Sequence, residues 1–420
     1  DSVPFDMVRD SWRLGRFRFA CPPVRVLSPF PVMTDLSLSE FFGISPVPGV
    51  EAAYYDGARL TDGYEVYAGD TNGMWPSHTD YRMTTENHLL AYMWPHPWLD
   101  HELRRIQDIF LLGRAPTTIG YVVGTSAAGA RFGRNGHQSA MIRIDRFCQA
   151  VVHRTRGRAR LTLFSDHGHC MGDSRRIELA EVLVDLGYRT TTRLEKPGDV
   201  VAPEFGLVSC AAVYTQQPEA VARDLVGVEG IELTAYRGDD DSVIVLGRAG
   251  TAAITKTDAG FRYDVVTGDP LNLMPILNAL SAHDRPIPDR SLFDATRDHE
   301  FPDAVQRLWR AFHGLVEHVP DVYVSTRDGY YCGSPLVDYF VDLVGVHGNL
   351  RAAGSFGFAM TGAGTLPDVV RMEDLRSSLA ALGVPLASRG APLSNGATGS
   401  EHAGSAWNAS NRAARDTAGR

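Results

Sequence analysis

The run Leu-Thr-Leu-Phe-Ser-Asp-His-Gly-His-Cys at 161–170 has the residue types of a metal site at the end of a strand. In open parallel sheets, ligands bind beyond the carboxyl ends of the strands, which is where Asp166 and His167 are placed. A carboxylate and an imidazole that are adjacent on a turn can bind one divalent ion from two sides, and Gly168 allows a close backbone approach. The structural alternative is a turn with a capping Asp and solvated histidines.

A second candidate, Thr34, stands at a predicted helix start. The residues at 24–32 predict a strand that runs into a Pro-broken turn, and the helix that follows should end at Gly43. A helix N-terminus offers free N–H groups and positive potential to an anionic ligand. Thr34 is therefore placed where a threonine either caps the helix or faces a ligand.

The elements that must position these residues alternate between helix and strand. Such alternation is typical of a parallel sheet flanked by helices, so we predict an α/β protein, a three-layer α/β/α sandwich with a mainly parallel central sheet. The expected order is a helix near 101–113, a strand at 117–124, a helix at 137–155, a strand at 159–165 and a helix near 176–187.

Two insertions and a tail interrupt this pattern. Residues 45–100 are rich in Tyr, Trp, His, Gly and Pro with little periodicity, which predicts pocket-lining loops. Short apolar runs between Gly- and Asp-containing turns at 205–265 predict an antiparallel β subdomain. From residue 388 to 420 the chain is rich in Ser, Gly, Ala and Asn, which predicts a disordered tail after a single catalytic domain at 1–387.

Composition limits the possible partners. The formal net charge of -9, with dispersed arginines, argues against a nucleic-acid polymer as the ligand. No window approaches the roughly 18 apolar residues of a membrane span. The five cysteines are scattered without a CxxC pair, so we expect a reducing, cytoplasmic location and no thiolate zinc site. The chain starts with Asp rather than Met, and we expect its start to be processed or incomplete.

The Ser-Asp-His-Gly-His motif and the segment around Thr34 together resemble the alkaline phosphatase superfamily. The late segment at 345–362 and the meander are most similar to its type I phosphodiesterase/nucleotide pyrophosphatase branch. The resemblance implies that Asp1, Thr34, Asp166 and His167 bind one metal ion and that His347 binds another. It further implies contacts to these ligands or to the substrate from three more residues, namely Asn72, Ser126 and His169.

The implied activity is hydrolysis of small phosphate esters or anhydrides through Thr34, with zinc as the expected metal and manganese compatible. One departure concerns the second ion, because Ser126 and Ala130 stand where the superfamily has Asp and His. It therefore remains open whether the protein binds one ion or two, and whether His137 replaces the missing ligands. It also remains open whether the protein binds a ligand without catalysing a reaction. A sulfatase is disfavoured because Cys21-Pro22-Pro23 lacks the Arg of a CxPxR pattern.

Overall fold

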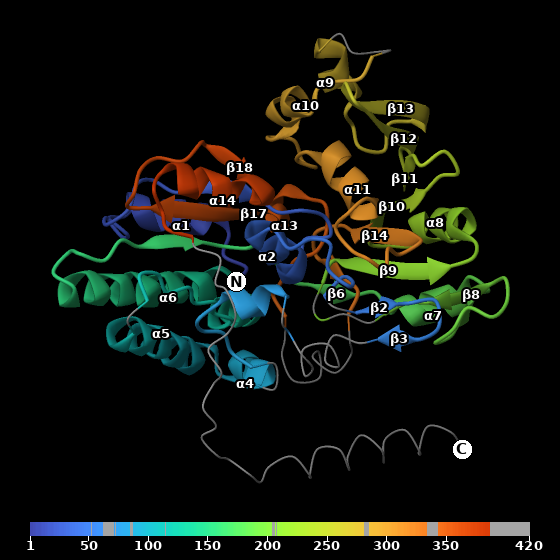
Figure 1. Ribbon diagram of the computed structural model, residues 1–420. Helices are drawn as coiled ribbons and strands as arrows, with labels where there is room; N and C mark the ends of the chain where they lie inside the picture. The colour runs from blue at the N-terminus through green and yellow to red at the C-terminus, as the bar shows by residue number, and fades with distance from the viewer. Residues whose placement is uncertain are drawn as a thin grey trace, which may run out of the picture. The chain divides into compact units, whose positions relative to one another are not determined.

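The computed structural model combines helices with two larger β-sheets, which confirms the predicted α/β class (Figure 1). It describes residues 1–386 apart from 52, 62–70, 72, 85–86, 114, 204–205, 207, 281–284 and 334–342. The predictions made for Asn72 and for the tail at 388–420 lie outside these described residues. Asp1–Ala387 group into one compact unit, and the description below is of that unit.

A four-stranded sheet in the order β18-β1-β17-β4 carries the two candidate motifs. Strand β1 and strand β4 both pair antiparallel to β17, so they run in the same direction. Their carboxyl ends therefore lie at the same edge of the sheet, and the turns to Thr34 and to Asp166 start there on either side of β17. The strands are β1 (Val24–Leu27), β4 (Thr162–Phe164), β17 (Phe356–Thr361) and β18 (Val369–Arg371).

The larger sheet has eight strands in the order β13-β12-β11-β10-β14-β9-β8-β7. The predicted antiparallel region at 205–265 supplies five of them, with helix α8 between β9 and β10. β10 to β13 follow one another as a meander, β14 lies between β10 and β9, and β9 pairs with β8. The strands are β7 (Arg189–Thr190), β8 (Asp199–Val201), β9 (Cys210–Thr215), β10 (Ile231–Arg237), β11 (Val243–Gly247), β12 (Gly250–Thr257), β13 (Gly260–Gly268) and β14 (Val322–Thr326).

The prediction of a mainly parallel sheet is wrong for the described strands, whose ladders are mainly antiparallel. In the two larger sheets only β1–β18 and β7–β8 pair in parallel. The physical reason lies in the connections, because the short turns between β10 and β13 permit only antiparallel neighbours. The remaining two-stranded pairs are β2 (Tyr54–Tyr55) with β3 (Leu60–Thr61), β5 (Cys170–Met171) with β16 (Gly345–Val346), and β6 (Arg175–Arg176) with β15 (Tyr330–Tyr331).

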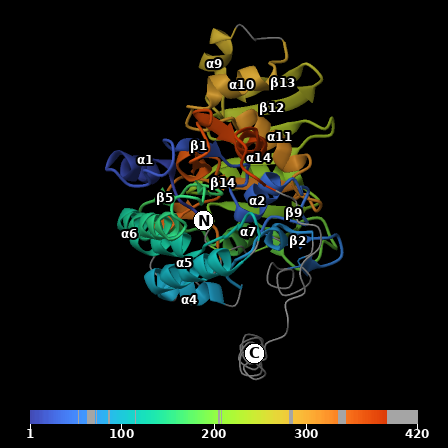
Figure 2. The same cartoon turned by 60° about the vertical axis from the view of Figure 1, so that its left-hand side comes forward.

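Two long helices, α5 (Pro95–Leu112) and α6 (Gly124–Arg154), lie side by side in both views (Figures 1 and 2). Both begin earlier than predicted, and 117–124 forms no ladder beyond a single bridge between Tyr81 and Gly120. The early start of α6 has a tertiary cause, since the buried Glu102 carboxylate on α5 accepts hydrogen bonds from Val123 N (3.0 Å) and Gly124 N (2.8 Å). A carboxylate at this place satisfies the free amides of a helix N-terminus.

The other helices cover the sheets or form the pocket region. They are α1 (Phe5–Arg13), α2 (Thr34–Phe42), α4 (His88–Met93), α7 (Leu179–Asp185), α8 (Pro218–Val226), α9 (Met274–Ala279), α10 (Asp289–Thr296), α11 (Ala304–Phe312), α13 (Ala352–Ser355) and α14 (Met372–Ala381). Within 45–100 the described elements are short until α5, namely β2, β3, α4 and a 3-10 turn at Trp75–His78. None of the described helices is long and apolar enough to span a bilayer.

Glu102 gives the fold a predictable pH dependence. Burial raises the pKa of Glu102 to about 7, although the amides of Val123 and Gly124 oppose the shift. The pKa of Glu102 is higher in the folded state than in the unfolded state, so protonation of Glu102 stabilises the folded state. This stabilisation is lost as the pH rises through 7. Relative to Glu102→Gln, we expect the wild-type free energy of unfolding to fall by up to about 3 kcal/mol between about pH 5 and pH 8.

Urea unfolding of both proteins at the two pH values measures this difference. The exposed Glu195→Gln is the matched control and should leave the pH slope as it is in the wild type. Identical slopes for the wild type and Glu102→Gln would contradict a proton held on this buried cap.

Candidate functional site

Thr34 lies where β1 has turned into α2, as its first helical residue, and Met33 rather than Thr34 is the N-cap. Its hydroxyl therefore does not cap the helix by a side-chain bond, which removes the structural alternative. Instead Thr34 Oγ1 donates to Asp166 Oδ2 at 2.7 Å and lies 3.4 Å from His167 Nε2. The hydroxyl is thus directed away from its own helix and toward the turn that follows β4.

The turn after β4 fixes Asp166 and His167 through its own backbone. Asp166 Oδ1 accepts hydrogen bonds from Ser2 N and from His167 N, each at 3.0 Å, which leaves Oδ2 for Thr34. His167 Nδ1 lies 2.8 Å from Gly168 O, so Nδ1 carries the proton and Nε2 keeps its lone pair. The predicted need for glycine at 168 is also confirmed, because a Cβ there would lie 2.5 Å from Phe356 O.

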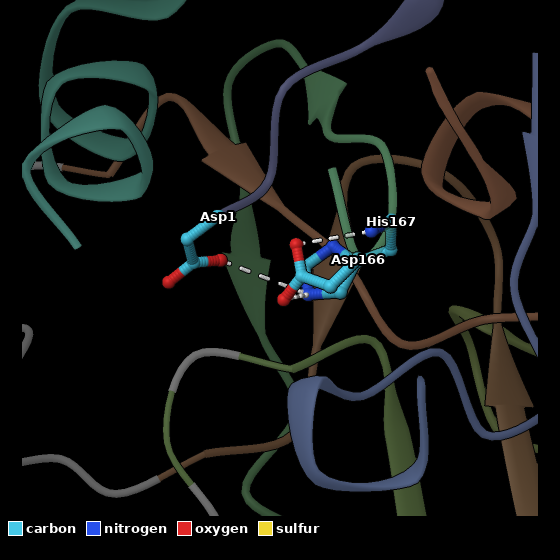
Figure 3. A group of neighbouring side chains, drawn as sticks. All are labelled: Asp1, Asp166 and His167. Atoms are coloured by element: carbon cyan, nitrogen blue, oxygen red, sulfur yellow. Dashed lines mark hydrogen bonds and ion pairs between the residues drawn. The ribbon is translucent and has the colours of Figure 1, made fainter. Parts of the chain in front are cut away.

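Asp1 completes a group of three side chains (Figure 3). Its Oδ1 lies 3.8 Å from His167 Nε2, and Asp166 Oδ2 lies 3.5 Å from the same nitrogen. Ser2 Oγ donates to Asp1 Oδ1 at 2.7 Å and holds this carboxylate in place. One ligand atom from each of the three residues lies within 4.8 Å of the others, a spacing that can hold one metal ion. Two carboxylates and an imidazole are a donor set that suits zinc or manganese.

The protonation states of Asp166 and His167 also suit metal binding. Burial would raise the pKa of Asp166, but His167, the chain's amino group and the hydrogen bonds from Thr34 and Ser2 outweigh it and hold that pKa below its usual value. Burial lowers the pKa of His167 below its ordinary value. At neutral pH the pair is therefore a carboxylate beside a neutral imidazole, which are the forms that bind metal.

His347 joins this group from the loop after β16. Its ring stacks on that of His167, with centroids 4.0 Å apart and an angle of 27° between the planes. His347 Nδ1 lies 2.8 Å from Val32 O, so its Nε2 is also left with a free lone pair. Burial, and secondly the neighbouring His167, lower the pKa of His347 to about 3. The sequence therefore identified a residue that the fold does bring to the site.

The region predicted for a second ion is built from hydroxyl groups. Ser126 Oγ lies 3.1 Å from Ser2 Oγ and 3.3 Å from Tyr92 OH, and the nearby Ala130 is buried. His137 Nε2 lies 3.1 Å from His169 Nδ1, and the metal-capable group found among the described residues consists of Asp1, Asp166 and His167. His169 thus contacts His137 directly, and its ring centroid is 6.2 Å from that of His347.

Two phenols at the site were not predicted from the sequence. Tyr121 OH donates to Thr34 Oγ1 at 3.4 Å, and Tyr92 OH reaches Ser126. Tyr121 comes from the segment 117–124, which was expected to be a strand, and no motif marked Tyr121 within it. Tyr92 lies on α4 in the loop-rich region, where no periodicity marks it.

Arg307 of α11 links the two loops that carry Thr34 and His347. Its guanidinium donates to Leu350 O at 3.0 Å, to Ser355 Oγ at 2.8 Å and to Pro29 O at 3.4 Å. Arg307 is fully buried, and burial lowers its pKa to about 9. A single side chain therefore joins the segment before Thr34 to the segment after His347.

Arg307→Leu should leave these buried acceptors without a donor. We expect the free energy of unfolding to fall by about 3 kcal/mol, measured by chemical denaturation. Arg223→Leu, on the exposed side of α8, is the control and should change stability by less than about 0.5 kcal/mol. Equal stability of Arg307→Leu and the wild type would show that the loops do not depend on this guanidinium.

Comparison with known proteins identifies the fold. No family model matches the chain, and no curated protein matches it in sequence. Among solved structures, an inactive variant of murine ectonucleotide pyrophosphatase/phosphodiesterase 5 in complex with AMP superposes with a TM-score of 0.51 at 14% identity, covering 98% of this chain and 97% of that one. The human protein of the same name gives a TM-score of 0.49 at 13% identity, covering 98% and 97%.

A further similar structure is phosphonoacetate hydrolase from Sinorhizobium meliloti 1021 in complex with phosphonoformate, with a TM-score of 0.43, 10% identity and coverage of 91% and 94%. At these identities the likeness concerns the fold. The chain therefore has the α/β fold of nucleotide pyrophosphatase/phosphodiesterases, which the resemblance to the alkaline phosphatase superfamily implied.

Proposed function

We propose that this chain, which has the fold of a nucleotide pyrophosphatase/phosphodiesterase, is a metal-dependent hydrolase of small phosphate esters or anhydrides. The observation that carries the proposal is the position of Thr34 Oγ1, 2.7 Å from Asp166 Oδ2 and 3.4 Å from His167 Nε2. Two segments that are far apart in the sequence supply this group. A hydroxyl beside a buried carboxylate and a buried neutral imidazole provides the parts that nucleophilic attack on phosphorus requires.

The residues fit a divalent ion. Asp1, Asp166 and His167 offer three ligand atoms, and the tautomer of His167 is set by Gly168 O so that Nε2 faces the carboxylates. When bound there, the ion supplies positive charge to the phosphoryl oxygens and lowers the pKa of the Thr34 hydroxyl. We propose zinc, with manganese compatible, because imidazole and carboxylate suit both.

The chain's own residues account for the rest of the reaction. Thr34 Oγ1 attacks phosphorus, the bond from phosphorus to the leaving oxygen breaks, and the Thr34 proton passes through solvent to the leaving oxygen, while Asp166 Oδ2 orients the hydroxyl before the attack. The amides at the start of α2 face the phosphoryl oxygens with positive potential. Water then cleaves the bond between Thr34 and phosphorus, and Thr34 regains its proton.

The number of ions depends on His347. Its free Nε2 is available, but Ser126 and Ala130 add neither a carboxylate nor an imidazole beside it. We propose one ion at Asp1, Asp166 and His167, with His347 as a substrate-facing group or as the only strong ligand of a weaker second ion. This same observation favours the alternative function, a protein that binds a phosphorylated ligand without hydrolysing it.

Hydrolysis of bis(4-nitrophenyl) phosphate and of 4-nitrophenyl phosphate tests the proposal directly. The full chain should lose activity after chelation and regain it with zinc or manganese, with the diester as the better substrate. Activity that is unchanged by the chelator would refute the metal-dependent reaction. Tight binding of zinc without hydrolysis of either compound would instead support the ligand-binding alternative.

A further inference from the structure

Tyr121 lies against the hydroxyl that attacks phosphorus in the reaction proposed above. Its phenol donates to Thr34 Oγ1 at 3.4 Å, while that hydroxyl donates to Asp166 Oδ2 at 2.7 Å. Catalytic hydrogen bonds are often long before substrate binds and shorten in the complex. The oxygen of Thr34 therefore has one acceptor and one donor beside it, and they come from two different segments of the chain.

Of the three side chains that contact this oxygen in the described part of the chain, Tyr121 is the one that can donate to it. An ionised carboxylate only accepts hydrogen bonds, so Asp166 receives the proton of Thr34 and has none to offer. His167 Nε2 lies 3.4 Å from Thr34 Oγ1, but the ring proton is on Nδ1, which lies 2.8 Å from Gly168 O. The phenol therefore has a role that the carboxylate and the imidazole cannot take.

Both the backbone and the ring of Tyr121 are held in place. Tyr121 N donates to Tyr81 O at 2.8 Å. The ring packs edge-on against Trp75, with centroids 4.9 Å apart. Trp75 Nε1 donates to Asp35 Oδ1 at 2.8 Å, and Asp35 is the neighbour of Thr34 in α2. The ring that carries the donor is thus braced on the helix that carries the hydroxyl, and a donor fixed in this way needs no reorganisation during a reaction.

We propose that Tyr121 is a catalytic residue of the second step, in which phosphorylated Thr34 is hydrolysed; this role rests on the function proposed above. Water attacks phosphorus, the bond between phosphorus and Thr34 Oγ1 breaks, and the electron pair of that bond stays on Oγ1. The Tyr121 hydroxyl donates a hydrogen bond to this oxygen as negative charge develops on it, and Tyr121 keeps its own proton. Oγ1 then takes up, through solvent, the proton that the attacking water loses.

The second step depends on this donor more than the first does. In the first step Thr34 Oγ1 gives electron density to phosphorus, and the negative charge develops on the oxygen of the leaving group. In the second step Oγ1 is itself the leaving oxygen, and an alkoxide leaves far less readily than a phenolate. Loss of one donor to a developing oxyanion slows a reaction by roughly 100- to 1,000-fold. Removing the phenol should therefore slow hydrolysis of the intermediate and leave its formation nearly unchanged.

Rapid-quench kinetics of the full chain with zinc and bis(4-nitrophenyl) phosphate test this role. Tyr121→Phe keeps the ring against Trp75 and should release the first 4-nitrophenolate at a rate close to that of the wild type. Its steady rate should then fall by roughly a hundredfold. Mass spectrometry after acid quenching should find the aryl phosphate attached to Thr34, and metal content should equal that of the wild type.

Tyr323→Phe is the matched control. It removes a buried phenol oxygen that has no hydrogen-bond partner among the described residues, and it should leave both rates as they are in the wild type. A steady rate of Tyr121→Phe equal to that of the wild type would overturn the role of Tyr121. Equal slowing of both steps, with no adduct on Thr34, would also overturn it, because the phenol would then only orient the nucleophile.

These two results would leave the proposed hydrolase function intact. If instead the wild type releases no 4-nitrophenolate with zinc or manganese, the proposed function is refuted and the role of Tyr121 is refuted with it. The behaviour of the wild type therefore separates failure of the function from failure of this assignment.

Discussion

Replacing Thr34 with alanine is expected to reduce the hydrolysis of an aryl phosphodiester by roughly a thousandfold or more. Thr34 Oγ1 is the hydroxyl that lies within hydrogen-bond reach of Asp166 and close to His167 Nε2, so its removal leaves the proposed reaction without its nucleophile. The proposed metal ligands Asp1, Asp166 and His167 are untouched by the change. The loss should therefore appear in kcat, while metal content stays at the wild-type level.

Two further variants make this prediction specific. Thr34→Ser keeps a hydroxyl at the start of α2 and should retain measurable turnover. Thr296→Ala removes the buried hydroxyl of a different threonine, which donates to Leu292 O within α10, and should retain full activity. Turnover by Thr34→Ala at the wild-type rate would eliminate Thr34 as the nucleophile and leave water as the attacking group.

The second large effect concerns the metal. Asp166→Asn should weaken metal binding by more than the roughly 10- to 100-fold that loss of a hydrogen-bonding partner of a ligand costs, because a ligand itself becomes neutral. Its carboxylate has two functions here, since Oδ1 accepts the Ser2 and His167 amides while Oδ2 faces Thr34 and His167 Nε2. Asparagine can keep one of these contacts but cannot supply the negative charge.

Metal content after dialysis, measured by mass spectrometry, and thermal unfolding with and without zinc provide the readouts. Wild-type protein should be stabilised by about 4 kcal/mol when zinc is present at a thousand times its dissociation constant, whereas Asp166→Asn should gain far less at the same concentration. Asp145→Asn is the matched control, because Asp145 is also buried and accepts a backbone amide, that of Phe17. Equal zinc stabilisation of all three proteins would exclude Asp166 as a ligand.

The sequence singles out Thr34, Asp166, His167 and His347 as candidates because each belongs to a short pattern with a characteristic local geometry. A strand that ends in Asp-His-Gly is typical of a turn, because glycine relaxes the backbone sterics there. A Pro-containing turn before Thr34 similarly leaves little choice but a helix start. These features depend on neighbours within a few residues, and local sterics alone decide them.

Other parts of the site could not be predicted because they depend on distant partners. The apolar residues at 117–124 were interpreted as a strand, yet α6 begins at Gly124 because Glu102, on another helix, satisfies its first amides. That change of backbone direction brings Ser126 next to Ser2 and Tyr92. The hydrophobic pattern of the segment cannot predict where α6 begins, because the stabilising carboxylate is more than twenty residues away.

By itself, then, the sequence determined the α/β class and the antiparallel strands of the meander, and it supplied the candidate hydroxyl, carboxylate and imidazole of the proposed site. Tertiary structure alone decided the direction of strand pairing outside the meander, the hydroxyl groups around Ser126 and the contact of Tyr121 with Thr34. The division has a physical cause. Backbone sterics and hydrophobic period act over a few residues, whereas ladder direction and side-chain convergence are fixed only when distant segments compete for the same backbone hydrogen bonds and the same buried space.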